Sequence, residues 1–299
     1  MRLRVLGAAA GGGYPQWNCS CDVCSRARAG EAQPRTQSSI ALRGGNDPAA
    51  DEPWVVVNAS PDLRQQLAAL PFERTGLRAS PVKAVVLTDA EIDHTAGLLL
   101  LRESSARLQV YSTEAVRVAL TDRYPVLRML ENYCGVDWHE LKPGAVTAID
   151  GTTLELEPFD TGGDAPLYMG NDEGPGAIGL TVRDRAGGGV LCYAPAILDF
   201  DDALAARMRE SAVVLADGTF WTKDELVDLG LTTRDALAMG HAPLSGENGT
   251  LETLSALDAR TILVHINNSN PILLDRSPQR ALVEERGVEV GYDGLEVEL

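Results

Sequence analysis

The chain of 299 residues lacks the features that define several common protein classes. It contains no run of about eighteen uncharged apolar residues, which excludes a typical transmembrane helix. The segment Met1 to Leu6 has neither the apolar stretch nor the small-residue cleavage site of a secretion signal. We therefore expect a cytoplasmic protein without a membrane span.

Basic residues are few, because 26 Lys and Arg stand against 43 Asp and Glu, for a net charge of -17. Nucleic-acid affinity comes largely from basic side chains that neutralise phosphates, so no nucleic-acid partner is expected. The acidic balance fits an enzyme that holds cations in carboxylate pockets, although it would equally serve solubility alone. Hydrophobic residues make up 44% of the chain, which is enough for a large buried core.

Cysteine is also scarce, and an odd number, five, without a secretion signal argues against a disulfide framework. Three of the five, Cys19, Cys21 and Cys24, crowd into one loop, residues 19–24. Zinc prefers four tetrahedral nitrogen or sulfur ligands, so we expect a structural Zn2+ whose fourth ligand comes from elsewhere. The candidate is His241, one of only four histidines, on a Gly- and Pro-rich turn. The alternative is that the cysteines are reduced loop thiols without a metal.

Short runs rich in β-branched residues alternate with helical patterns along the whole chain, which predicts an α/β sandwich. A loop at the tip of a hairpin is expected at 46–53. The predicted strands are 2–6, 39–42, 54–58, 82–87, 108–111, 154–158, 178–182, 190–194, 213–216 and 261–265. The predicted helices are 61–70, 113–120, 202–210, 223–229, 251–256 and 278–286.

The glycine-rich segment Gly7 to Gly13 follows the first predicted strand. It does not predict a nucleotide site, because Tyr14 and Pro15 prevent a helix from starting there. We expect the glycines to let the backbone approach metal-bearing loops closely.

The most informative segment runs from Thr88 to Leu98 and reads T-D-A-E-I-D-H-T-A-G-L after an apolar strand. It resembles the T-H-x-H-x-D-H-x-x-G-L signature of the metallo-β-lactamase superfamily. Asp89 and Glu91 replace the first two histidines of that signature. This motif loop, residues 88–98, is therefore still expected to bind a metal, but a different one.

Three segments together resemble the PqqB family of pyrroloquinoline quinone (PQQ) biosynthesis proteins, namely 11–21, 89–94 and 265–273. The resemblance spans nearly the whole chain. It implies one metallo-β-lactamase domain over residues 1–299, an α/β fold of four layers, αβ/βα, with metal-bearing loops at one edge. The cysteine loop is similar to the structural zinc site of a related phosphonate-pathway phosphodiesterase, which uses three cysteines and a histidine.

Carried over position by position, the resemblance implies a metal site of Asp93, His94, Asp217 and His265. The superfamily's remaining histidine has no counterpart in 168–180. Two histidines with carboxylates and open positions are typical of non-haem iron enzymes that activate oxygen. We therefore expect these four residues to be catalytic and to bind Fe2+. Asp89 and Glu91 are expected to complete a second metal position, made of oxygen ligands only, or to orient the other ligands.

The activity that the resemblance implies is hydroxylation of the tyrosine ring of a Glu-Tyr unit cut from a precursor peptide, with O2 as co-substrate. Asn267, Asn268 and Asn270 follow His265 and are expected to bind the amino-acid part, although loop polarity would also explain them. The first alternative is a non-catalytic carrier that transports PQQ or its precursor. The second is a zinc-dependent hydrolase, which the missing histidines disfavour. The expected partners are this small peptide or amino-acid precursor and a second copy in a homodimer.

Overall fold

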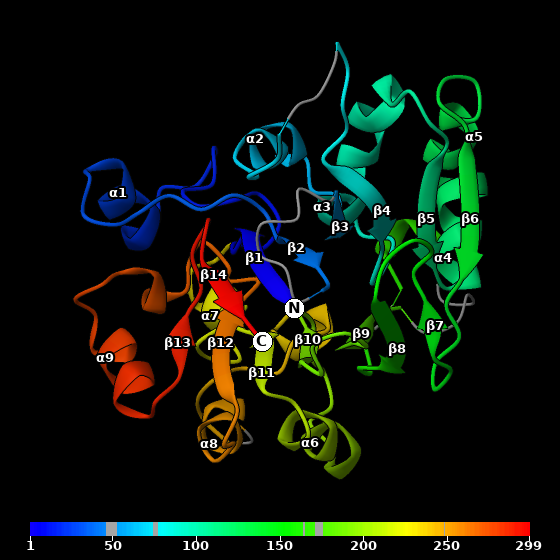
Figure 1. Cartoon of the computed structure of the whole chain (residues 1–299). Coiled ribbons are helices and arrows are strands. Elements are labelled where there is room, and N and C mark those ends of the chain that lie inside the picture. Colours follow the sequence, from blue (N-terminus) through cyan, green and yellow to red (C-terminus); the bar gives the residue numbers. More distant parts are fainter. Residues whose placement is uncertain (46–52, 74–76, 164, 171–175, 248) are drawn as a thin grey trace.

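The computed structural model describes residues 1–45, 53–73, 77–163, 165–170, 176–247 and 249–299. The loop predicted at 46–53 lies outside these ranges except for Pro53. The described chain forms two seven-stranded sheets that stack on each other (Figure 1). Each sheet is antiparallel over one half and parallel over the other.

Neighbouring strands in each sheet are hydrogen-bonded to one another. Across the first sheet the order is β14 (Glu296–Glu298), β1 (Arg2–Gly7), β2 (Ser39–Arg43), β3 (Trp54–Val57), β4 (Val82–Val86), β5 (Leu108–Ser112) and β6 (Val136–Glu140). Across the second it is β13 (Glu289–Val290), β12 (Arg260–Val264), β11 (Val213–Asp217), β10 (Val190–Ala194), β9 (Ile178–Asp184), β8 (Leu154–Asp160) and β7 (Thr147–Ala148).

The helices are short. The α-helices are α1 (Asp22–Arg28), α2 (Leu63–Ala68), α3 (Ile92–Thr95), α4 (Glu114–Val118), α5 (Val126–Leu130), α6 (Asp202–Arg209), α7 (Glu225–Asp228), α8 (Thr250–Ser255) and α9 (Pro278–Glu285). The 3-10 helices are η1 (Ala96–Glu103), η3 (Leu167–Met169), η4 (Leu237–Met239) and η5 (Pro271–Leu273), and η2 (Ala119–Arg123) is a π-helix. No described helix has the length and apolar character required to cross a lipid bilayer.

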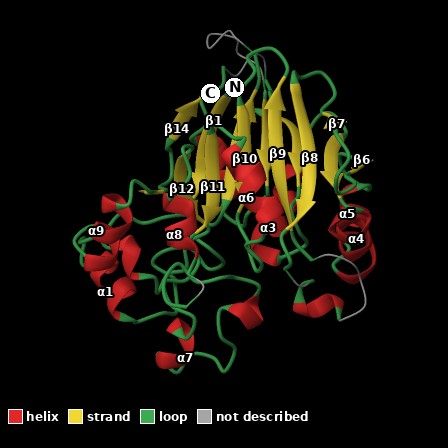
Figure 2. Ribbon diagram, turned by 90° about the horizontal axis from the view of Figure 1, so that it is seen from below, coloured by secondary structure: helices red, strands yellow, loops and turns green. Residues whose placement is uncertain are grey.

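The layers are held together by three buried clusters. Leu3 and Ile40 of the first sheet pack with Leu156, Leu180 and Leu215 of the second between the two sheets. Helices α6, α8 and α9 bury apolar side chains on the outer face of the second sheet. Helices α2, α4 and α5 do the same on the first. Figure 2 shows α6 and α8 lying over the strands of the second sheet. The predicted four-layered αβ/βα sandwich is therefore confirmed.

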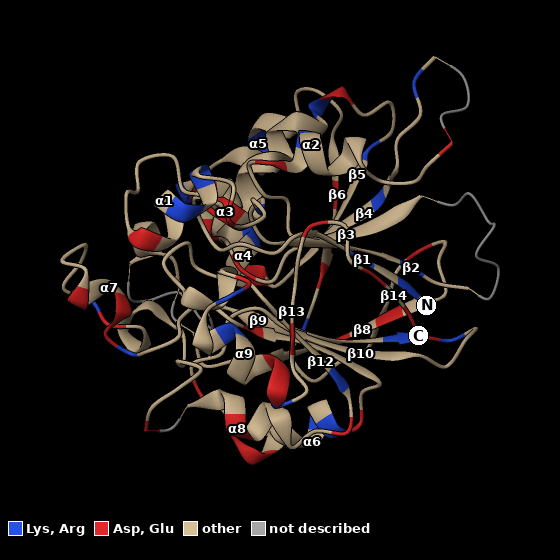
Figure 3. Ribbon diagram, turned by 90° about the vertical axis from the view of Figure 1, so that its left-hand side faces the viewer, with Lys and Arg blue, Asp and Glu red and all other residues tan. Residues whose placement is uncertain are grey.

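Charged residues are distributed over many elements rather than gathered on one. Acidic residues occur on α7, α8 and α9, far apart in sequence, and basic residues lie among them (Figure 3). The net charge of -17 therefore does not by itself mark one binding face.

The parallel halves of the sheets position the candidate site. Strand β4 ends just before the motif loop, β11 ends at Asp217, and β12 ends just before His265. Because β11 and β12 are parallel neighbours, their carboxyl ends open at the same edge. The motif loop of the first sheet reaches this edge too, since Asp93 lies 3.6 Å from His265.

Candidate metal centre

His94 is held in the motif loop by Asp89. Its Nδ1 lies 2.8 Å from Asp89 Oδ1 and 2.7 Å from Oδ2. Asp89 also accepts from Thr88 Oγ1 and from the backbone N–H of Glu91. Asp89 was expected either to bind a metal or to orient the other ligands, and it belongs to no cluster of potential ligands among the described residues. Its carboxylate instead fixes the imidazole of His94.

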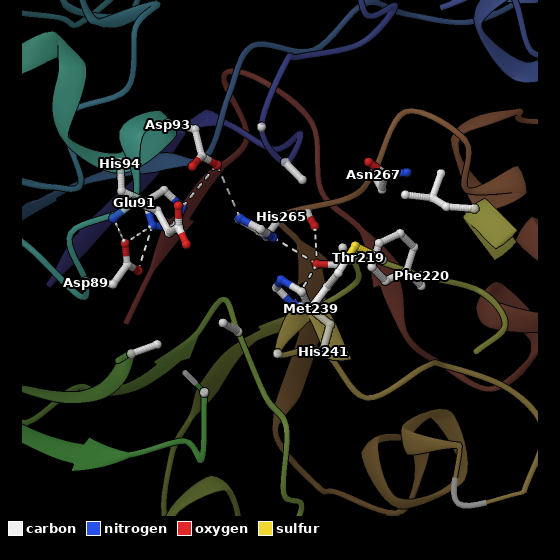
Figure 4. A pocket seen from close by; sticks show the side chains of 17 residues that line it. Asp89, Glu91, Asp93, His94, Thr219, Phe220, Met239, His241, His265 and Asn267 are labelled. Carbon is white, nitrogen blue, oxygen red and sulfur yellow. Dashed lines mark hydrogen bonds and ion pairs between the residues drawn. The ribbon is translucent and has the colours of Figure 1, made fainter. Parts of the chain in front are cut away.

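The other ring nitrogen of His94, Nε2, is the one available to a metal once its proton is displaced. His94 Nε2 is buried and has no hydrogen-bond partner among the residues that the structure describes. Asp93 Oδ2 lies 3.8 Å from it and 3.6 Å from His265 Nε2. Figure 4 shows the three side chains pointing toward one another. One ligand atom from each lies within 4.8 Å of the others, so these three predicted residues come together as a ligand group.

The close approach expected of the glycine-rich segment occurs at Gly11. A Cβ atom built on Gly11 would lie 3.2 Å from Asp93 Oδ2. A side chain here would therefore press on the carboxylate that faces both histidines.

A second ligand group contains Asp217, His241 and His265. His241 Nδ1 lies 2.7 Å from Asp217 Oδ2, and the rings of His241 and His265 stack with centroids 5.1 Å apart. The prediction that His241 completes the cysteine site is therefore wrong. After η4, Gly240 adopts a left-handed conformation at φ 85°, and His241 follows it directly at the sheet edge.

Thr219, which was not predicted from the sequence, connects this second group. Its Oγ1 lies 2.6 Å from Asp217 Oδ1, 2.8 Å from His265 Nδ1 and 3.1 Å from His241 Nδ1. Burial lowers the pKa of His265 from its usual value, against the opposing hydrogen bond to Asp93. The carboxylate of Asp217 only accepts, so it takes the one hydroxyl hydrogen of Thr219. The Nδ1–H of His265 therefore donates to Thr219, which leaves Nε2 facing Asp93. The only sequence signal was the position of Thr219 two residues after Asp217.

The backbone of His265 adopts the left-handed conformation at φ 54°, which is uncommon for a residue with a side chain. The carbonyl oxygen of His265 lies 2.8 Å from Thr219 Oγ1, and the next backbone N–H, of Ile266, donates to Ala8 O at 2.9 Å. Such conformations persist where the surroundings enforce them, often at functional sites. These two contacts, at the carbonyl of His265 and at the N–H of Ile266, hold the ring of His265 at the sheet edge.

Glu91 lines the cavity but belongs to no ligand group among the described residues. Burial, followed by the charges of Asp89 and Asp93, raises the pKa of Glu91 to about 7. A carboxyl group that titrates near neutrality is suited to accept or donate a proton. The structure does not place Glu91, predicted as an iron ligand, in either ligand group.

The cavity in front of both ligand groups has a volume of about 250 Å³. Its apolar wall includes Phe220, Leu226 and Met239. Of the three predicted asparagines, Asn267 lines it. The other two do not: Asn268 Nδ2 donates to Cys24 Sγ at 3.2 Å, and buried Asn270 donates to Gly218 O at 2.9 Å.

The three cysteines of the N-terminal loop gather as predicted, with their sulfur atoms within 4.8 Å of one another. Among the described residues, no histidine, acid or further cysteine joins them. The carbonyl oxygen of Asn268 lies 3.7 Å from Cys24 Sγ and 3.9 Å from Cys21 Sγ. The donor set fits a metal that completes its coordination with this oxygen or with solvent.

Metal binding at His94 is expected to release a proton. Burial lowers the pKa of His94, but the charges of Asp89 and Asp93 outweigh it and raise the pKa to about 9. Below about pH 9, a metal must therefore displace a proton from Nε2, so its apparent affinity rises with pH up to that value. Calorimetry in buffers of different protonation enthalpy measures this release.

The Asp89→Asn variant tests the cause of this release. Loss of the carboxylate charge lowers the pKa of His94, so less proton is released near pH 7. Proton release that is the same in wild type and variant would contradict the role of Asp89.

Comparison with known proteins relates the whole chain to one family. Residues 53–266 match the family model of the beta-lactamase superfamily domain. Coenzyme PQQ synthesis protein B of Methylococcus capsulatus is 45% identical, over 100% of this chain and 100% of its own. The protein of the same name from Cupriavidus necator is 45% identical over 99% of each chain.

Solved structures agree. The crystal structure of Zn2+-bound PqqB from Methylobacterium extorquens is similar with a TM-score of 0.89 and 37% identity, over 100% of both chains. A diphosphatase of the PhnP family has a TM-score of 0.67 at 19% identity, over 100% of this chain and 98% of its own, and so shares the fold alone. The metallo-β-lactamase fold predicted from the motif loop is confirmed.

Proposed function

The chain belongs to the family of coenzyme PQQ synthesis protein B, within the beta-lactamase superfamily, and from this we propose that it catalyses a metal-dependent step of PQQ biosynthesis. The proposed reaction is hydroxylation of the tyrosine ring of a Glu-Tyr unit derived from a precursor peptide. A ring C–H becomes C–OH, one oxygen atom of O2 enters the product and the other leaves as water. An external reductant supplies the electrons and protons.

The observation that carries this proposal is the group of Asp93, His94 and His265. Two imidazoles and one carboxylate beside a cavity are the ligand set of many non-haem Fe2+ oxygenases. The buried, unpartnered Nε2 of His94 supports metal binding here, because a buried ring nitrogen without a partner is costly. Bound Fe2+ would supply the activation of O2 that no side chain can provide.

The protein's own residues position the substrate and carry its proton. Phe220, Leu226 and Met239 offer an apolar wall against which an aromatic ring packs. Glu91, with a pKa raised by burial to about 7, is the group suited to take the phenolic proton. Asp89 and Thr219 hold His94 and His265 in place throughout.

Metal replacement tests this proposal. Protein purified without oxygen and stripped of metal is expected to consume O2 and hydroxylate Glu-Tyr after Fe2+ is added, but not after Zn2+ is added. Oxygen electrode traces and mass spectrometry of the product measure both. Equal hydroxylation activity after addition of Zn2+ would contradict the oxygenase assignment.

One observation favours a zinc-dependent hydrolase as second candidate. His241 adds a third imidazole to the site, beside Asp217, and neutral imidazoles suit zinc. A phosphodiester turnover assay with the zinc-loaded protein distinguishes this candidate from the first. The carrier function remains the outcome if Glu-Tyr or PQQ binds tightly without O2 consumption.

A further inference from the structure

A relay of hydrogen bonds holds the side chain of Asn267 at the cavity wall. Asn267 Nδ2 donates to Ser269 Oγ at 2.5 Å, and Ser269 Oγ donates to Glu225 Oε1 at 2.5 Å. Asn267 is 9% exposed and Ser269 is 5% exposed, so the relay is largely shielded from solvent. Glu225 belongs to α7 and lies 44 residues before Ser269 in sequence.

The direction of this relay follows from the donors at Glu225. Its Oε2 accepts from the backbone N–H of Trp221 at 2.7 Å, a donor that cannot reverse. Above its pKa of about 7, Glu225 is ionised and only accepts, so the hydroxyl of Ser269 must give its hydrogen to Oε1. The lone pair of Ser269 is then left for an N–H donor. This assigns the Nδ2 side of the Asn267 amide to Ser269.

The opposite end of the amide, Oδ1 of Asn267, is left for a ligand. No donor among the described residues bonds to it. In Figure 4 this oxygen lies on the side of the histidines, whereas the nitrogen points away from them. Asn267 therefore presents an acceptor to the metal-site cavity.

Asn267 also stands between two cavities. Together with Leu226 it lines the metal-site cavity and a second cavity of about 530 Å³ beside the cysteine loop. A molecule that extends from the metal site into the second cavity would pass Oδ1. Besides Cys19, Ser20 and Cys21 of the cysteine loop, the second cavity is lined by neutral amides and leucines, which are Gln16, Asn18, Asn267, Asn268, Leu226, Leu229 and Leu231. Neutral amides of this kind complement a peptide backbone.

We propose that Asn267 is a specificity-determining residue whose side-chain oxygen accepts a hydrogen bond from an N–H group of a peptide substrate. Ser269 and Glu225 are positioning residues that keep the amide in its accepting orientation. The inference rests on the proposed function for its substrate, Glu-Tyr, which offers an α-ammonium and a peptide N–H. An acceptor at this point favours such donors and disfavours a carboxylate.

The Glu225→Gln variant tests this orientation. The N–H of Trp221 would hold the new amide oxygen, so the NH2 of the variant side chain faces Ser269. The hydroxyl of Ser269 then has no acceptor at position 225, so it donates to Oδ1 of Asn267 instead. The amide of Asn267 turns over to accept this bond, and its NH2 group then faces the cavity. The preference for N–H donors is expected to disappear.

Binding of Glu-Tyr to the Fe2+-loaded protein without oxygen is measured by calorimetry at about pH 8, above the pKa of about 7 to which burial raises Glu225. The comparison ligands are glutaryl-tyrosine, without the α-ammonium, and the analogue methylated at the peptide nitrogen. Wild type is expected to bind Glu-Tyr about tenfold more tightly than the analogue lacking the contacted N–H. In the variant this ratio is expected to approach one.

Ser269→Ala removes the middle of the relay and is expected to lower the same ratio. Glu252→Gln, at an exposed carboxylate on α8, is the matched control and should keep it. Circular dichroism checks that each variant is folded. An unchanged ratio in folded Glu225→Gln and Ser269→Ala, with all ligands weakened equally, would overturn the inference.

The outcomes separate this inference from the proposed function. Binding of Glu-Tyr with the expected ratio, but no hydroxylation, would overturn the oxygenase assignment and support the role of Asn267. Hydroxylation of Glu-Tyr with equal affinity for all three ligands would support the oxygenase assignment and overturn the role of Asn267. No measurable binding of Glu-Tyr to wild type would overturn both.

Discussion

The His265→Ala variant is expected to lose the metal of the sheet edge completely and to fall in activity by at least roughly a hundredfold. The reason is that His265 belongs to both ligand groups, one with Asp93 and His94 and one with Asp217 and His241. Substitution of His241 removes a ligand from the second group only. His241→Ala is therefore expected to keep the metal that Asp93 and His94 bind.

Elemental analysis of protein purified without oxygen measures this difference. His139→Ala is the matched control, because His139 stacks on Tyr111 and bonds to Gln109, outside both groups. The cysteine site is expected to keep its zinc in all three variants. A full metal content in His265→Ala would contradict the assignment of the edge site.

The Cys24→Ala variant is expected to lose the structural zinc and much of the stability. Cys24 is fully buried, and its sulfur contacts Asn268 from the distant loop after β12. Metal bound only by the folded chain adds its binding free energy to folding. Loss of the ion is expected to cost at least about 3 kcal/mol and to lower Tm by roughly 10 °C.

Scanning calorimetry with zinc analysis measures both effects. Cys192→Ala is the control, since Cys192 is buried but lies outside the cysteine group. Its loss removes only a small apolar side chain, so zinc content should stay unchanged. Absence of zinc from the wild type, with equal falls in Tm for the two variants, would show that the cysteines are reduced thiols.

Local pattern was sufficient to predict much of this molecule. The strand predicted at 190–194 coincides with β10, and the motif loop was found because an apolar strand directly precedes it. The two-residue strand β13 and the charged strand β14 escaped prediction. Their sequences are too short and polar to show alternation, so only pairing with distant strands makes them strands.

Potential ligands at the ends of strands could be predicted from the sequence, but a ligand on a long connection between strands could not. Asp217 and His265 end or follow neighbouring parallel strands, so their proximity follows from topology. His241 lies on a long connection between these strands, and its place depends on how η4 and the turn after it pack. The roles of Asn268 and Asn270 depended equally on tertiary contacts, since identical side chains in one loop point to a cysteine and to a backbone carbonyl.

The hydrogen bond between His265 Nδ1 and Thr219 has a consequence for stoichiometry. With Nδ1 occupied, the imidazole has one lone pair left, on Nε2, and a lone pair coordinates one cation at a time. Ions placed in the two ligand groups would thus compete for a single electron pair. Titration of the edge site should saturate at one tightly held equivalent per chain, and a second metal species added afterwards should exchange with the first rather than bind beside it.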